Sequence, residues 1–225
     1  MNREEIDAKV FLNGEWWNLC VGLGVKNKVL IREKFNALCQ NYSAPKRYYH
    51  APSHLVRCFE EFQPVESLCH NPLAIKFALF GHDMFYDVTR KDNEVRSAIW
   101  TRTTILELGL SEDFAFRVYG FILLTEHKKL PSVDLDAQFL VDIDLSSLGS
   151  SPEVFNRNTA DICREYVEGL GITAEAFHVG RIGFIEDLLD KGRRPYIYST
   201  DYFREKYELR ALENLKRSLA ILRKE

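Results

Sequence analysis

Residues 71–83 read Asn-Pro-Leu-Ala-Ile-Lys-Phe-Ala-Leu-Phe-Gly-His-Asp, and this stretch decides the fold that we expect. Asn71 followed by Pro72 is typical of a helix start, because asparagine caps free backbone N–H groups and proline fits the first helical position. Apolar residues then recur at helical spacing and predict an inward-facing side: Leu73, Phe77 and Phe80. The predicted helix ends near His82 and Asp83, two side chains that can bind metal.

Outward from this segment, capping residues and apolar stripes alternate in the same way along the chain. The expected helices cover residues 3–19, 26–42, 52–62, 71–83, 93–108, 111–125, 134–148, 151–169 and 173–189, followed by a long amphipathic helix from Asp201 or Tyr202. Only residues 194–199 look extended. About ten helices joined by short loops, with almost no strand signal, predict an all-α helical bundle.

We expect a single domain over residues 1–225, with N-terminal helices over 1–45 and a C-terminal helix over 200–225 packing on the core. The C-terminal helix carries an apolar stripe that either closes the core or forms a dimer contact. Its residues are Leu209, Leu212, Leu215, Leu219 and Leu222. The sequence therefore leaves monomer and homodimer open.

Composition narrows the class of partner. Hydrophobic residues make up 46% of the chain and the net charge is -3, which is typical of an ordinary globular protein. A near-balanced charge disfavours a large basic surface for nucleic acid, so a small-molecule partner is expected. Five cysteines without a CxxC spacing indicate neither a disulfide framework nor a zinc knuckle, and we expect buried reduced thiols.

Targeting and membrane signals are weak. The N-terminus is too charged for a signal peptide. The most apolar run, residues 114–125, is too short to span a bilayer and contains Arg117. We therefore expect a cytoplasmic protein without a membrane span.

Three further positions join His82 and Asp83 in a pattern of metal-binding residue types. His54 lies early in the predicted third helix, and Asp142 and Asp144 flank the last apolar position of a later one. Mixed histidine and aspartate ligands suit one divalent ion such as Mn, Fe, Co, Ni, Zn or Mg. The absence of a thiolate from this set disfavours structural zinc.

Taken in order, several blocks of the chain resemble the HD superfamily of metal-dependent phosphohydrolases, and in particular its small branch of predicted metal-dependent enzymes. The blocks are Tyr49-His50, Ser53-His54-Leu55, Phe80 to Asp87, Asn93-Glu94, Ser97-Ala98, Thr125-Glu126-His127, Asp142 to Gly149, Ile197 to Thr200 and Ala211 to Leu215. The resemblance covers most of the chain and implies an HD-domain-like helical bundle.

The resemblance implies a ligand set for one divalent ion: His54, His82, Asp83 and Asp144. Asp144 is preferred to Asp142 because the superfamily's last aspartate commonly precedes a leucine-containing turn, and Asp142 is the alternative. His50 is an alternative first histidine, although its place in a loop favours a phosphate contact. The implied reaction is hydrolysis of a phosphoester or phosphoanhydride by a metal-activated water.

Roles beyond the ligands are expectations. Asp83 or Glu94 would accept the proton of the attacking water, and His127 or His50 would protonate the leaving oxygen. Four cations are the expected phosphate contacts: Lys46, Arg47, Arg181 and Arg210. The expected substrate is a small phosphorylated metabolite, in the first place a nucleotide.

Each of these residues also has a purely structural interpretation. Glu94 suits the first turn of a helix and His127 suits a helix end, because both positions match the helix dipole. Either of Asp142 and Asp144 can be an ordinary cap. An alternative function, a non-catalytic HD-fold nucleotide sensor or protein-interaction module, is disfavoured by the intact ligand set. Cleavage of structured nucleic acid is disfavoured by the acidic charge balance.

Overall fold

The computed structural model describes residues 3–127 and 133–224. Over this part the chain is all-α and contains no strand, as predicted. Its α-helices are α1 (Arg3–Gly22), α2 (Lys28–Tyr42), α3 (Pro52–Phe62), α4 (Pro72–Gly81), α5 (Asn93–Glu107), α6 (Glu112–Leu124), α7 (Leu135–Leu145), α8 (Pro152–Leu170), α9 (Ala174–Leu189), α10 (Asp201–Phe203) and α11 (Leu209–Leu222). Short turns η1 (Gln63–Leu68), η2 (Ser146–Gly149) and η3 (Arg204–Glu208) complete them.

Helix α4 lies at the centre of the larger part of the molecule. Seven of its ten residues are buried, and it packs against α1, α3, α5, α6 and α7. A helix that is apolar on every side is stable only when neighbours surround it. A Cβ on Gly81 would lie 2.1 Å from Thr101 Oγ1, so α5 crosses α4 at a distance that requires glycine. This crossing fixes the chain immediately before His82.

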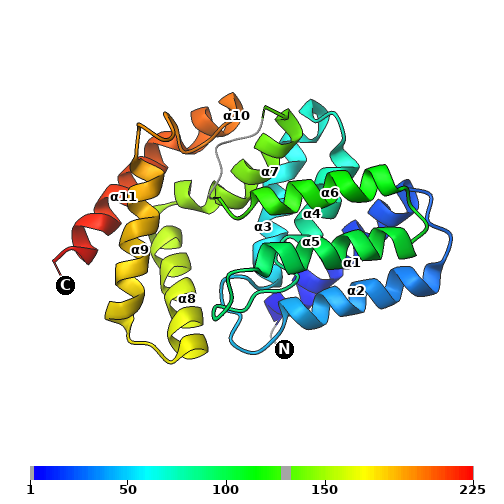
Figure 1. The fold of residues 1–225 in the computed structure, drawn as a ribbon, viewed down its shortest axis with the longest axis horizontal. Helices are drawn as coiled ribbons and strands as arrows, with labels where there is room; N and C mark the ends of the chain where they lie inside the picture. Colours follow the sequence, from blue (N-terminus) through cyan, green and yellow to red (C-terminus); the bar gives the residue numbers. More distant parts are fainter. Residues whose placement is uncertain (1–2, 128–132, 225) are drawn as a thin grey trace.

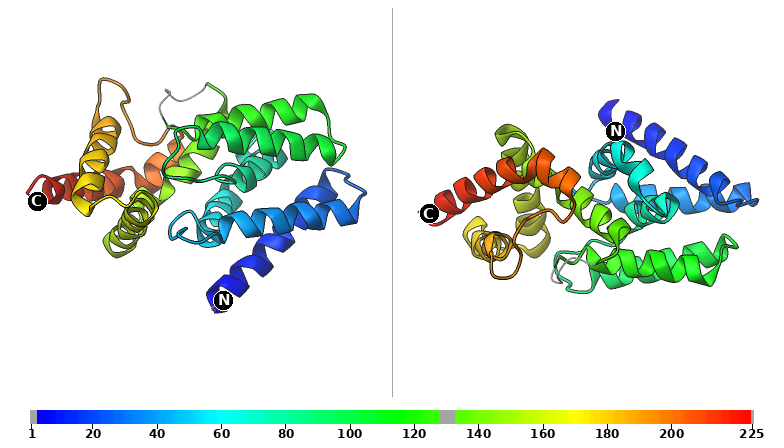
Figure 2. Two further views of the ribbon diagram at one scale, coloured as in Figure 1. Left: turned by 60° about the horizontal axis from the view of Figure 1, so that its bottom comes forward. Right: turned by 90° about the horizontal axis from the view of Figure 1, so that it is seen from above.

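The helices form two groups joined by α7 and η2. Helices α1 to α6 gather on one side, while α8, α9 and α11 lie together on the other (Figure 1). Figure 2 shows the same separation in two further views. One cluster of buried apolar residues extends from Leu12 through both groups to Leu215. The segment between the groups contains Asp142 and Asp144, so the predicted site lies where they meet.

Several predicted caps are confirmed. Asn71 Oδ1 accepts a hydrogen bond from the backbone N–H of Ala74 at 3.1 Å, and Pro72 is the first residue of α4. Hydroxyl caps of the same kind begin three other helices where they were expected, at Ser111, Ser151 and Thr173, and Thr200 caps α10 in the same way without having been predicted. Such caps pair backbone N–H groups that a helix leaves free.

Three elements differ from the expected ones. The helix predicted over residues 134–148 ends at Leu145 and continues as the 3₁₀ turn η2. The C-terminal helix is interrupted by η3, a π-helical turn that separates α10 from α11. Residues 194–199 form an irregular segment rather than a strand.

The residues of the apolar stripe on the C-terminal helix differ in how deeply they are buried. Leu215 is fully buried, whereas Leu209 is 73% exposed. Leu212, Leu219 and Leu222 are partly buried against the core. Most of the stripe therefore closes the core. Across the described residues, no helix combines the length and apolarity that crossing a membrane would require.

Candidate metal centre

Four side chains converge between the two groups of helices. His54 comes from the first turn of α3, His82 and Asp83 from the C-terminal end of α4, and Asp144 from the last turn of α7. Both histidines are buried, with exposed fractions of 2% and 1%. The structure therefore brings together all four ligands that the resemblance implied.

The distances within this cluster are short. His54 Nε2 lies 3.1 Å from His82 Nε2 and 3.3 Å from Asp144 Oδ1. His82 Nε2 lies 3.1 Å from Asp83 Oδ2 and 3.6 Å from Asp144 Oδ1. Asp83 Oδ2 and His54 Nε2 are 3.7 Å apart.

These separations fit a shared ion. Ligand atoms bound at about 2.1 Å lie roughly 3.0 Å apart in an octahedron and roughly 3.4 Å apart in a tetrahedron. The five distances in the cluster fall between 3.1 and 3.7 Å. Two imidazoles and two carboxylates are also a donor set that divalent transition metals accept. The residues present therefore fit the expected metal.

The pKa shifts show how strongly the cluster interacts. Burial lowers the pKa of His54. Burial also opposes the charged form of His82, but the carboxylates of Asp83 and Asp144 outweigh burial and raise its pKa well above the usual value. Both carboxylates have lowered pKa values despite their burial, because histidine nitrogens surround them. A positive charge at this point is thus favoured by the two aspartates.

His82 is oriented by its own helix. Its Nδ1 donates to the backbone carbonyl of Leu79 at 2.8 Å, which leaves Nε2 facing the cluster. Such a hydrogen bond fixes the tautomer of a metal-binding histidine. Tyr42 holds the adjoining turn, since its hydroxyl accepts from Asp83 N–H and donates to the Phe80 carbonyl, both at 3.1 Å.

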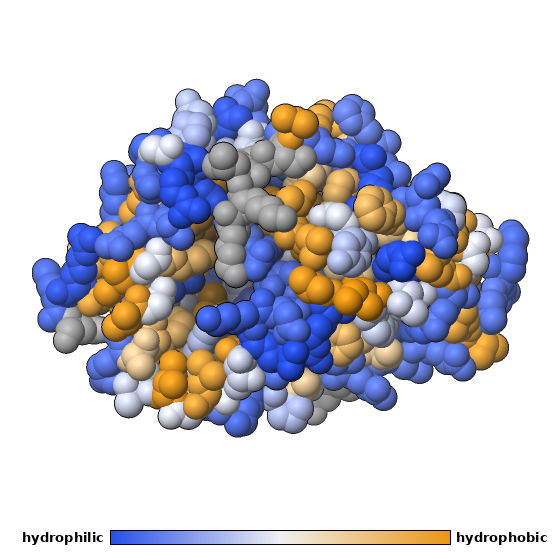
Figure 3. Space-filling view, in the orientation of Figure 1, coloured by the Kyte–Doolittle hydropathy of each residue, from blue (hydrophilic) through white to orange (hydrophobic). Residues whose placement is uncertain are grey.

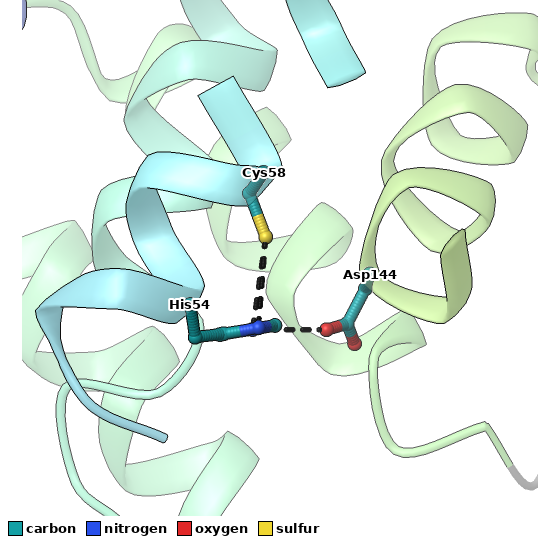
Figure 4. Close-up of side chains that lie close together, drawn as sticks. All are labelled: His54, Cys58 and Asp144. Atoms are coloured by element: carbon teal, nitrogen blue, oxygen red, sulfur yellow. Dashed lines mark hydrogen bonds and ion pairs between the residues drawn. The ribbon is translucent and has the colours of Figure 1, made fainter. Parts of the chain in front are cut away.

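Asp142 and Asp144 point in different directions. Side chains two residues apart on a helix are separated by roughly 200°. Asp144 faces His54 (Figure 4). Asp142 accepts hydrogen bonds from Ser199 N–H and from the N–H and hydroxyl of Thr200, at 2.7 to 2.8 Å. Burial raises the pKa of Asp142 to about 6, although these hydrogen bonds favour its ionised form. Asp142 therefore holds the segment before α10 in place through Ser199 and Thr200, whereas Asp144 belongs to the cluster.

Figure 4 also shows Cys58, one turn after His54 on α3. Its Sγ lies 3.6 Å from His54 Nε2. All five cysteines are free, but only Cys20 and Cys58 are buried, whereas burial of all five was expected. Burial raises the pKa of the Cys58 thiol well above its usual value. Two groups of three side chains have a spacing that suits a metal: His54, His82 and Asp83, and His54, Cys58 and Asp144. Cys58 is therefore a further ligand-type side chain beside the cluster, which the sequence patterns did not single out.

His127 makes contact with the cluster through Asp144. Its Nε2 donates to Asp144 Oδ2 at 2.9 Å, while its Nδ1 is buried without a partner. The residue has a positive φ of 58°, and its carbonyl accepts a hydrogen bond from Arg194. With Nδ1 shielded and Nε2 engaged, His127 is placed to position Asp144 rather than to protonate a leaving group.

His50 lies in the loop before α3 and is held by Glu165 of α8. The His50 Nδ1 atom donates to Glu165 Oε2 at 2.7 Å, and the backbone N–H groups of Tyr48, Tyr49 and His50 donate to Glu165 Oε1 at 2.8 to 2.9 Å. Burial opposes the ionisation of Glu165, but His50 and these donors prevail and lower its pKa. The His50 ring stacks on Tyr86 with centroids 3.7 Å apart.

A cavity of about 600 Å³ opens from this cluster between the two groups of helices. Its polar end is formed by Asp83, Asp144, His50 and His127, and its other end by residues of α8 and α9. In the orientation of Figure 3, the surface is hollowed beside the α8–α9 hairpin. Cavities of this size accommodate metabolite-sized ligands.

Two of the expected phosphate contacts lie elsewhere. Arg47 donates to the carbonyls of His50, Asp83 and Met84 and so ties the loop before α3 to the turn after α4. Arg210 donates to the Gly149 carbonyl at 2.7 Å. Neither lines the cavity. Their positions indicate structural roles, because their guanidinium groups already serve backbone carbonyls.

The remaining expected residues divide in the same way. Lys46 donates to the Glu168 carbonyl at 2.7 Å and does not line the cavity. Arg181 and Glu94 do line it. Arg181 is only 9% exposed, and its Nε is buried without a partner. Burial lowers the pKa of this guanidinium. Of the four expected cations, Arg181 is the one available to a ligand.

Sequence reasoning missed several residues of the site. Arg90 and Lys91 line the cavity from the connection before α5, and Asn158 lines it from α8. Adjacent cations in a loop were a visible signal for the first two. Glu165 and Asn158 had no such signal, because a polar residue on an amphipathic helix is usually exposed.

Comparisons with family models, with curated proteins and with solved structures find no match for this chain.

Proposed function

We propose that this protein is a divalent-metal-dependent phosphohydrolase of the HD type. In this proposal His54, His82, Asp83 and Asp144 hold one ion, and the substrate is a small phosphorylated metabolite, in the first place a nucleotide. When bound, the ion would supply Lewis-acid activation of water and of a phosphoryl oxygen.

One observation carries the proposal. His54 Nε2 and His82 Nε2 each lie within 3.7 Å of a carboxylate oxygen of Asp83 and of Asp144, and these two aspartates also line a cavity of metabolite size. A cluster that served packing alone would not require two buried imidazoles and two carboxylates at the end of a cavity, because buried ionisable groups are costly. A metal ion compensates that cost.

The surrounding residues have distinct proposed roles. His127 positions Asp144 through the Nε2 to Oδ2 hydrogen bond. His50 lines the cavity and has its Nδ1 fixed by Glu165, so its Nε2 is the ring nitrogen proposed to protonate the leaving oxygen. Asp83 or Glu94, both in the cavity wall, accepts the proton of the attacking water.

Arg181 supplies the proposed contact with the phosphate. Its guanidinium is buried in the cavity wall, and no carboxylate of the described residues pairs with it. A phosphate group would satisfy both the charge and the unpaired Nε–H donor. The cavity volume of about 600 Å³ favours a small substrate over structured nucleic acid.

The first test combines metal analysis with turnover. The protein is purified without chelator and analysed for its elements, and the same preparation is assayed for phosphate release from a nucleotide panel with added Mn, Co, Ni or Mg. We expect roughly one ion per chain and hydrolysis of at least one panel member. Metal without turnover of any phosphorylated compound would favour the sensor alternative, and absence of metal would refute the proposal.

The matched variants are Asp144→Asn and Asp142→Asn. They remove the same charge from the same helix two residues apart, but only Asp144 faces the cluster. Loss of metal and turnover in the first variant alone is the expected result. Equal loss in both would mean that the effect comes from α7 as a whole.

A further inference from the structure

The cavity changes character along its length. Near the cluster its wall is polar, whereas the α8–α9 end is formed largely by apolar and aromatic side chains, among them Ile162, Tyr166, Phe177 and Phe184. The rings of Tyr166 and Phe177 lie 5.4 Å apart. A phosphate group alone would occupy only the polar end, so the apolar end is suited to the organic part of a ligand.

Unpaired polar groups are buried in this apolar end. Asn158 of α8 is 7% exposed, lines the cavity, and has an amide Nδ2 without a hydrogen-bond partner. Arg181 of α9 is 9% exposed, also lines the cavity, and has an Nε without a hydrogen-bond partner. Buried donors are almost always paired in proteins, so these two require a partner such as a water or a ligand acceptor.

The contacts also show which aromatic side chains lie beside the polar groups of the cavity. His50 stacks on Tyr86 with ring centroids 3.7 Å apart, and the Arg181 guanidinium lies over the ring of Phe184, 4.8 Å from its centroid. Arg181 therefore lies against one of the aromatic side chains of the apolar end. A phosphate held by the cluster and by Arg181 would direct its attached group towards α8 and α9.

We infer that the α8–α9 hairpin is the specificity wall of the site, which binds a planar heteroaromatic group attached to the phosphate and donates the Asn158 amide to an acceptor on that group. This inference deepens the proposed function and depends on it. Aromatic and aliphatic side chains provide stacking surfaces, and a single buried donor discriminates between groups with and without an acceptor.

Helix α9 offers a matched pair of test variants. Gly180 lines the cavity, and a Cβ added there would meet no atom within 4 Å. Gly183, on the same helix, is equally unobstructed but does not line the cavity. Gly180→Leu adds bulk to the specificity wall, while Gly183→Leu makes the same change of residue outside it.

The experiment measures equilibrium binding by calorimetry to metal-loaded full-length protein, with metal content determined for every preparation. The probes are the four common nucleoside 5′-monophosphates and ribose 5-phosphate, which carries the same phosphate and sugar without a base. We expect at least one nucleotide to bind about 10-fold or more tightly than ribose 5-phosphate. Gly180→Leu should abolish that preference without changing ribose 5-phosphate binding or metal content, and Gly183→Leu should preserve it.

Asn158→Leu provides a second measurement, since it nearly keeps the size of the side chain and removes the amide donor without adding a charge. It should reduce the preferred nucleotide's affinity about 10-fold or more and leave ribose 5-phosphate unaffected. Equal affinity for nucleotides and ribose 5-phosphate in the unmodified protein would overturn the inference, as would equal weakening of both by Gly180→Leu. Since metal content is recorded separately, a chain that binds metal but shows no base preference refutes this inference and leaves the proposed phosphohydrolase intact.

Discussion

The two sides of α7 use the same side chain for different purposes. On one side, Asp142 accepts hydrogen bonds from the backbone and hydroxyl of the segment before α10. On the other, Asp144 is bonded to no backbone N–H in the described part of the chain and faces the nitrogens of three histidines. A buried carboxylate whose donors are backbone N–H groups and a hydroxyl of one short segment holds that segment in place, whereas one surrounded by imidazoles is a candidate ligand.

The largest expected difference between the two sides is in turnover. Asp144→Asn should lose bound metal and reduce kcat/KM by about 10³-fold or more, equivalent to about 4 kcal/mol of transition-state stabilisation. Asp142→Asn should retain metal and remain within about 10-fold of the unmodified protein at a temperature where it is folded. Elemental analysis and phosphate release check both. Normal turnover in Asp144→Asn would contradict the assignment of that side of α7.

The second expected difference is in folding stability. At pH 8 the Asp142 carboxylate is ionised, but burial raises its pKa to about 6, so its charge costs stability in the folded protein. Asp142→Asn should therefore lower the free energy of unfolding by only about 1 kcal/mol, because relief of that cost partly offsets the loss of charge-assisted hydrogen bonds. Urea denaturation of metal-free protein measures the loss. A decrease in the free energy of unfolding of less than about 0.5 kcal/mol would show that the segment before α10 does not depend on the Asp142 carboxylate.

Added metal should raise the melting temperature of some of these proteins and not of others. An ion at 100 times its dissociation constant stabilises the folded state by about 2.7 kcal/mol if it binds only that state. The rise in melting temperature should occur in the unmodified protein and in Asp142→Asn but not in Asp144→Asn. A similar rise in all three proteins would place the metal away from α7.

Glu165 combines both kinds of contact, since it accepts three backbone N–H groups and also holds His50. Its pKa is lowered on folding, so its contribution to stability is present above the unfolded pKa of about 4.3 and is lost as pH falls below it. Glu165→Gln should therefore cost about 2 kcal/mol at pH 7 and progressively less below about pH 4. Urea denaturation across this pH range measures the difference, and a constant gap would contradict this account.

Much of the fold could be predicted from the sequence because its signals are local. A cap such as Asn71 and the apolar spacing after it depend only on neighbours in the chain, and they identify a helix without knowledge of its surroundings. The breaks at Leu145 and at η3 were missed because tertiary packing causes them. Gly149, for example, lies so close to Tyr207 that a Cβ would approach its ring to 2.8 Å.

The candidate site was predictable only in part, for a related reason. The residue types alone indicated His54 and His82 as metal-binding candidates. Asp142 and Asp144 could not be told apart in this way, because the direction in which each side chain leaves α7 is known only from the structure. Arg47 was predicted to contact phosphate because it is a cation in a histidine-rich loop. In the structure its guanidinium instead donates hydrogen bonds to backbone carbonyls. Asn158 is identifiable only after the cavity is known.

Two buried carboxylates that accept hydrogen bonds from backbone N–H groups also affect which positions of this chain can be substituted. Glu165 and Asp136 bind backbone N–H groups, which every residue except proline possesses, at positions 48, 49, 50, 70 and 71. The identities of Tyr48 and His70 therefore do not matter for these contacts, whereas the two carboxylates do. In a complete substitution library selected for folding, we expect positions 48 and 70 to tolerate most residues but exclude proline, while Asp136 and Glu165 tolerate almost none.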